Sequence, residues 1–222
     1  MNRLFNLDSP IMQFLSRVAD LVILNLLWLV LCVPIITAGA ATTALYRVCL
    51  DMAAESDSGI VSTFFRTFKR EFKPATLTWL VLLVPTVLCA LNIWLLLSGA
   101  LNASIIMPAI CLLPLLILVF VYAYVFGYIA LFENGVWQTL RNALLLSIAN
   151  LPRTLLMSLL NLIPVIWLLI HPVSFLRVGI IWILIGFALT AYGNARILRK
   201  VFTKFSPELA ERDQAGRGGE ES

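Results

Sequence analysis

The sequence has little charge for its length. Asp, Glu, Lys and Arg make up 13% of the 222 residues, and 61% are hydrophobic, whereas a soluble domain carries about 25% charged and about 45–50% apolar residues. No charged side chain occurs from Pro74 to Phe132. Such a chain cannot hide its apolar surface from water by folding on itself. The composition predicts one membrane domain, residues 1–205, followed by a disordered polar tail, residues 206–222.

Groups that carry catalysis or bind metals are also scarce. His171 is the only histidine, and the four cysteines (Cys32, Cys49, Cys89 and Cys111) lie in apolar or amphipathic stretches without a CxxC pair. The sequence contains no HExxH, GxxxxGK[ST] or GxSxG motif. We therefore expect no catalytic, cofactor-binding or metal-binding residues, no cofactor and no enzymatic activity.

The net charge of +4 does not indicate nucleic acid. The basic residues gather at the edges of apolar runs, where anionic lipid headgroups attract each of them by about 1 kcal/mol. We expect the lipid bilayer as a partner, and no nucleic acid.

Five stretches are long and apolar enough to cross a membrane, which takes about 20 residues of helix. They are roughly 18–37, 75–98, 105–131, 154–171 and 175–195. The predicted fold class is an all-α, polytopic bundle of transmembrane helices with cytoplasmic amphipathic helices. Residues 1–17 either lie at the interface or extend the first span.

The distribution of Lys and Arg predicts how the spans thread the membrane. Thirteen of the sixteen basic residues fall in the connections 38–74 and 132–153 or after the fifth span, and only Arg3, Arg17 and Arg177 fall on the other side. Because cytoplasmic loops carry the excess of basic residues, the prediction is an outer N-terminus and a cytoplasmic C-terminus. The location predicted is a plasma membrane, which the chain crosses several times.

Two amphipathic helices are predicted in the cytoplasmic connections. Apolar residues recur with helical spacing from Ala41 to Met52, with Arg47 and Asp51 paired on the other face. A second helix, Ile60–Phe72, has an aromatic face and a cationic face, as in helices that lie in the headgroup plane. Its candidate contacts with lipid or a partner are Phe64, Phe65, Phe68, Lys69, Arg70 and Lys73.

Four polar residues within the predicted spans are candidate intramembrane sites: Asp20, Asn25, Asn92 and Asn161. Asp20 either anchors the first span together with Arg17 or contacts a solute or partner. The asparagines either join neighbouring helices or line a polar pocket, for which Asn92, Asn161 and Thr86 come first. The repeat of a Pro-X-Thr-Leu helix start at Pro74 and Pro152 leaves an internal duplication open.

Three blocks of the sequence resemble the YesL-like family of bacterial membrane proteins, a domain family of unknown function. The first contains Asn25-Leu26-Leu27-Trp28, Pro34, Thr37-Ala38-Gly39-Ala40 and Thr42-Thr43-Ala44-Leu45-Tyr46. The others are Phe64 to Thr76 and Leu140-Arg141-Asn142-Ala143-Leu144.

This resemblance implies a protein of five or six spans, encoded beside carbohydrate uptake systems, and it assigns no catalytic residue. The function expected is that of a non-enzymatic accessory or regulatory component of carbohydrate uptake, with the permease of a carbohydrate ABC transporter as a candidate partner. The alternative is a small-solute (sugar) transporter or channel.

Overall fold

The computed structural model describes residues 10–56, 59–98, 106–171, 173 and 179–206. This part of the chain is all-helical. The helices are α1 (Pro10–Cys32), η1 (Ile35–Thr37), α2 (Ala38–Ala53), α3 (Ile60–Arg70), α4 (Phe72–Leu97), α5 (Ile106–Leu131), α6 (Val136–Ala149), α7 (Leu151–Ile170), η2 (Trp182–Gly186) and α9 (Phe187–Phe205). The predicted tail and most of the two predicted outer turns lie outside the described residues.

The described residues contain five candidate spans, as the sequence predicts. They are Met12–Cys32, Phe72–Leu95, Leu113–Leu131, Leu151–Leu168 and Gly179–Phe205. The first begins earlier than predicted and ends earlier, because the extended backbone of Pro34 follows directly after it. Pro85, Pro114 and Pro164 lie inside α4, α5 and α7 without ending them.

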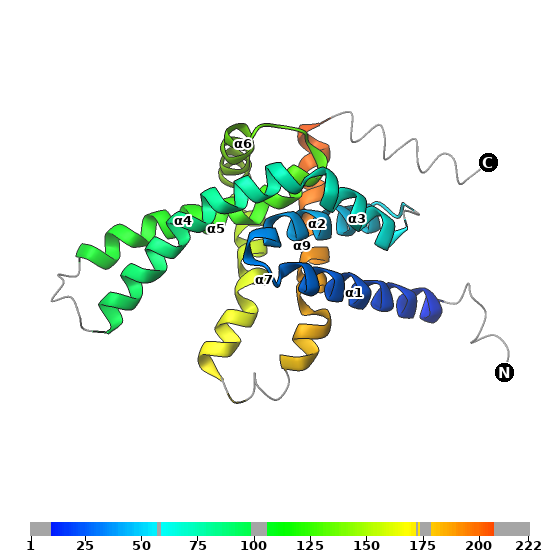
Figure 1. Ribbon diagram of the computed structural model, residues 1–222, viewed down its shortest axis with the longest axis horizontal. Coiled ribbons are helices and arrows are strands. Elements are labelled where there is room, and N and C mark those ends of the chain that lie inside the picture. The colour runs from blue at the N-terminus through cyan, green and yellow to red at the C-terminus, as the bar shows by residue number, and fades with distance from the viewer. Residues whose placement is uncertain (1–9, 57–58, 99–105, 172, 174–178, 207–222) are drawn as a thin grey trace.

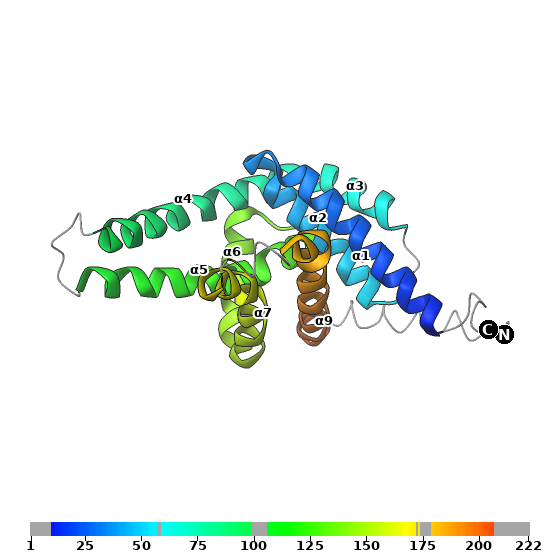
Figure 2. The same cartoon turned by 90° about the horizontal axis from the view of Figure 1, so that it is seen from below.

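The spans diverge from a common centre as three arms. Figure 1 shows α4 and α5 side by side on the left, α7 and the last span pointing down, and α1 pointing to the right. The view from below agrees, because α4 and α5 again extend away from α1 (Figure 2). Four of the five span windows bury only 17–28% of their residues, and α5 buries 56%. Most of the surface of the arms is therefore apolar and exposed.

Helix α2 occupies the centre and contacts α1, α3, α4, α5 and α9. Ten of its 16 residues are buried, and it begins with the small residues Ala38-Gly39-Ala40-Ala41. A side-chain Cβ at Gly39 would lie 2.5 Å from Trp79 Cβ and 2.6 Å from the backbone oxygen of Ala75. Only glycine therefore permits the close approach of α2 and α4.

Two arginines connect α2 to other helices through hydrogen bonds. Arg47 on α2 donates to Asp51 at 3.2 Å, as the sequence predicts, and to the carbonyl of Ala130 near the end of α5 at 3.2 Å. Arg199 on α9 donates to the carbonyl of Ala53 at the end of α2. Both guanidinium groups thus satisfy carbonyls in the last turn of a helix, where cations are favoured.

Helices α1 and α2 form an antiparallel hairpin through η1. Trp28 donates to Thr42 at 3.1 Å, and Arg17 lies 4.0 Å from Glu55, so the start of α1 is level with the end of α2. Arg17 also donates a hydrogen bond to the hydroxyl of Tyr192. The guanidinium of Arg196 lies over the ring of the same tyrosine, 4.9 Å from its centroid.

This contact is at odds with part of the predicted threading. The sequence places Arg17 outside and both Glu55 and Arg196 inside, yet the structure brings these residues together. If α1 crosses the membrane, α2 returns through the same layer. With 16 residues, α2 is about 24 Å long, and its backbone is shielded by protein, as membrane-embedded segments of this kind require.

Candidate functional site

The exposed face of α3 carries aromatic and basic side chains together. Val61 and Phe65 are exposed on it, at 46% and 39%, beside the exposed Arg66 and Lys69. The helix is fixed from behind, because Thr63, Phe64 and Thr67 are buried and α3 packs against α2, α1 and α4. A rigid helix therefore presents the ring of Phe65 and two cations on one surface. We call this surface the α3 face; it consists of Val61, Phe65, Arg66 and Lys69, together with Lys73 from the start of α4.

This arrangement corrects one predicted contact residue. Phe64 is fully buried and cannot reach lipid or a partner. The spacing of aromatic residues suggested that all of them share one outer face, but the threonines at 63 and 67 flank Phe64 on the packed side. Phe68 is partly buried and meets Phe72 edge-on at 5.6 Å, so Phe65 and the cations remain as the accessible part of the predicted set.

Glu71 is a residue that the sequence analysis missed. It joins α3 to α4, is only 5% exposed, and accepts a hydrogen bond from Arg70 at 2.6 Å. Arg70 is therefore tied to the fold and is less free than Lys69 to bind a partner. A buried acidic residue directly beside a cation was the available signal.

Asn25 fills a gap in the last span. The turn Trp182–Gly186 is a π-helix, a wider turn than the α-helix on either side of it. Asn25 is fully buried; its Nδ2 donates to the carbonyl of Ile183 at 2.6 Å and its Oδ1 accepts from the N–H of Ala188 at 2.8 Å. The amide thus bonds one acceptor and one donor of the backbone at this turn and joins α1 to the last span.

A second amide cluster connects α2, α7 and α9. Asn194, fully buried, donates to Tyr46 Oη at 3.1 Å and to Asn161 Oδ1 at 2.8 Å. Its own Oδ1 makes no hydrogen bond within the described part of the chain, and neither does the buried Ser158 Oγ. Asn161 was predicted as a polar residue of a span, whereas Asn194 was overlooked because it lies beside the basic end of α9.

The other predicted polar residues lie apart from this cluster. Asn92 is exposed and donates to Leu88 in its own helix at 2.9 Å. Thr86 bonds Tyr122 at 3.1 Å. Asn92, Asn161 and Thr86 each bond a different partner. Asp20 is partly exposed, and Arg17 contacts Tyr192 and Glu55 as described above, so the predicted pair of Arg17 with Asp20 is not among these contacts.

A cavity of about 310 Å³ lies between the ends of α5, α6 and α9. Tyr128 of α5 stacks on Phe132, just beyond the end of α5, at 4.7 Å, and Phe202 of α9 meets Phe132 edge-on at 5.7 Å. Tyr128 Oη accepts from Asn142 at 2.8 Å and from Asn134 at 3.0 Å. Among the described residues, no three His, Cys, Asp and Glu side chains gather as metal ligands would.

Comparisons with known proteins match only part of the chain. Residues 21–93 match the model of a family described as a protein of unknown function, DUF624. This segment contains most of α1, the central helix α2, the α3 face and most of α4. Neither the curated proteins nor the solved structures gave a match. The chain is therefore a multi-span membrane protein with a segment similar to a family of unknown function.

Proposed function

We propose that the protein is a non-catalytic accessory or regulatory component of the bacterial plasma membrane, which binds a membrane partner through the α3 face. The observation that carries this proposal is the exposure of Phe65 beside Arg66 and Lys69 on a helix whose other side is locked into the core. Burial of an aromatic ring gives affinity, and the flanking cations give orientation.

The partner proposed is the permease of a carbohydrate uptake transporter. The sequence resemblance described above is the support for the carbohydrate link. The large exposed apolar surface of the arms supports a partner within the membrane, since the spans leave most of their side chains free for lipid or for other helices.

The threading that goes with this function has both ends in the cytoplasm. With α1 and α2 as a hairpin that enters and leaves on the inner side, Arg3 and Arg17 join the thirteen inner basic residues, and only Arg177 of the sixteen remains outside. This threading obeys the positive-inside rule better than the one predicted from the sequence. It also keeps the α3 face on the cytoplasmic side.

Crosslinking in native membranes, followed by mass spectrometry of the captured proteins, tests the proposal. The informative variant is Arg66→Glu with Lys69→Glu, because both side chains are exposed and neither contacts Glu71. The charge-matched control is Arg212→Glu with Arg217→Glu, in the tail. We expect the wild type and the control to capture a permease, and the α3 variant to lose it. Equal capture by the wild type and both variants would contradict the role of the α3 face.

A small-solute transporter is the second candidate, and the amide cluster favours it. Asn194 Oδ1 and Ser158 Oγ are buried acceptors without a partner in the described residues, as in a site that awaits a polar solute. Purified protein in liposomes distinguishes the two functions. Uptake of labelled sugar by the protein alone, abolished by Asn194→Leu, would establish transport; absence of uptake together with permease capture supports the accessory role.

A further inference from the structure

The cavity between α5, α6 and α9 lies at the ends of two candidate spans. Tyr128 belongs to the span Leu113–Leu131 and Phe205 is the last residue of the span Gly179–Phe205, and both line the cavity. Its walls are mainly apolar; of its polar side chains, Asn142 and Tyr128 bond each other at 2.8 Å, and Ser206 is the third. The cavity therefore suits a flexible apolar chain better than a sugar, which would need several donors and acceptors that are free to bond it.

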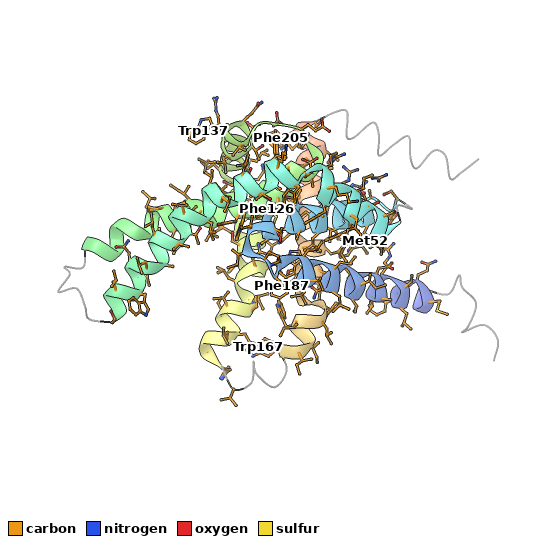
Figure 3. All side chains as sticks on the ribbon, viewed as in Figure 1. Met52, Phe126, Trp137, Trp167, Phe187 and Phe205 are labelled. Atoms are coloured by element: carbon orange, nitrogen blue, oxygen red, sulfur yellow. The ribbon has the colours of Figure 1, made fainter. Side chains whose placement is uncertain are left out.

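Helix α6 beside the cavity has the character of a helix that lies at the membrane surface. Trp137 is 80% exposed, and Leu145 and Ile148 are each 54% exposed, on the same side as the exposed Arg141. Figure 3 shows Trp137 on α6 and Phe205 at the end of α9 near the same edge of the molecule. Exposed apolar groups next to a cation are stable in the headgroup layer.

Two exposed cations are neighbours in sequence of residues that line the cavity. Arg141 precedes the lining residue Asn142 and stands one helical turn before Leu145, and Lys204 precedes the lining residue Phe205. Both are exposed. One acidic residue, the exposed Glu133, follows the lining residue Phe132 and opposes them in part. Two cations against one acidic residue leave a positive charge beside the cavity, which favours an anionic ligand.

We propose that this cavity binds one anionic phospholipid of the inner leaflet, with an acyl chain between Phe132, Phe202 and Leu145 and the headgroup phosphate beside Arg141 and Lys204. The lipid would join the α4–α5 arm to the last span, because Phe132 lies just beyond α5 and Phe202 is part of α9. The proposal does not depend on the identity of the protein partner.

Native mass spectrometry of the full chain tests the site. The protein is reconstituted in nanodiscs that contain phosphatidylcholine and phosphatidylglycerol in equal amounts, and the lipids retained after release are counted. One retained phosphatidylglycerol is expected. The variant Arg141→Gln with Lys204→Gln should lower the preference for phosphatidylglycerol by about 30-fold, as loss of two headgroup cations implies. The control Arg212→Gln with Arg217→Gln removes the same charge from the tail and should leave retention unchanged.

A second pair of variants tests the cavity. Ala149→Trp places an indole in the cavity and should abolish retention, and Glu133→Gln should raise it. A chain that ends at Ser206 shows whether the tail competes. Retention that appears only in this shortened chain would assign the cavity to the tail and overturn the proposal. Equal retention of both lipids, or no effect of the Arg141 and Lys204 variant, would also overturn it.

Discussion

Replacing Asn25 by leucine tests whether the amide between α1 and the last span stabilises the fold. Leucine has the same branched arrangement of side-chain heavy atoms as asparagine but makes no hydrogen bond, so the variant removes the bonds to Ile183 and Ala188, at 2.6 Å and 2.8 Å, without opening a cavity. Interhelical hydrogen bonds in membranes contribute about 0.6 kcal/mol on average and at most about 1.7 kcal/mol each. Two bonds lost from a fully buried site predict a destabilisation of about 1–3 kcal/mol.

The assay is reversible unfolding in mixed micelles, in which SDS displaces a mild detergent and helicity is followed by circular dichroism. Asn92→Leu is the matched control, since Asn92 is exposed and its amide donates to Leu88 of its own helix; the expected change is close to zero. The two sites differ because the Asn25 amide connects two helices, whereas the Asn92 bond stays within one. Equal stability of the two variants would refute the reasoning.

Three further changes test the centre of the fold. Gly39→Ala should destabilise the fold by about 1–3 kcal/mol, because the added Cβ would lie 2.6 Å from the backbone oxygen of Ala75. Gly135→Ala is the control: a Cβ there would have nothing within 4 Å, and the variant should be neutral in the same unfolding assay. Arg47→Met should cost about 1–2 kcal/mol, since it removes the bonds to Asp51 and Ala130, and an unchanged unfolding midpoint would show that the guanidinium is dispensable. Asp20→Asn and Asp20→Leu should both leave protein level and sugar-dependent growth normal, because the partly exposed carboxylate is not among the residues of the α3 face; a growth defect at normal protein level would give Asp20 a direct role.

The apolar runs were sufficient to predict the spans. Long stretches without charge, such as the one that ends at Phe132, can only be stable in lipid. The second, third and fourth spans are helices that begin and end within a few residues of the predicted bounds, whereas the first begins and ends earlier and the last extends into the basic residues at its end. The hairpin of α1 and α2 could not be predicted in this way. The segment Ala38–Ala53 is shorter than a typical span and rich in small residues, so hydropathy alone assigns it to a loop-side helix.

The contacts of individual residues were harder to foresee. The role of Asn25 depends on a π-helix in a span more than 150 residues away, and nothing in the sequence around Ile183 marks that turn. Phe64 and Phe65 are adjacent and both aromatic, yet one is fully buried and the other is 39% exposed. Helical spacing gives the relative direction of two side chains, but only the position of α2 decides which of them is packed.

Cysteine accessibility in intact cells tests the proposed threading most directly. Gln13→Cys, Ser56→Cys and Ser98→Cys are introduced singly after the four native cysteines are replaced by alanine, and all three positions are exposed. With α1 and α2 as a hairpin from the inner side, positions 13 and 56 react with an impermeant maleimide only after permeabilisation, and position 98 reacts in intact cells. Labelling of position 13 in intact cells, with position 56 protected, would contradict the hairpin and restore an outer N-terminus.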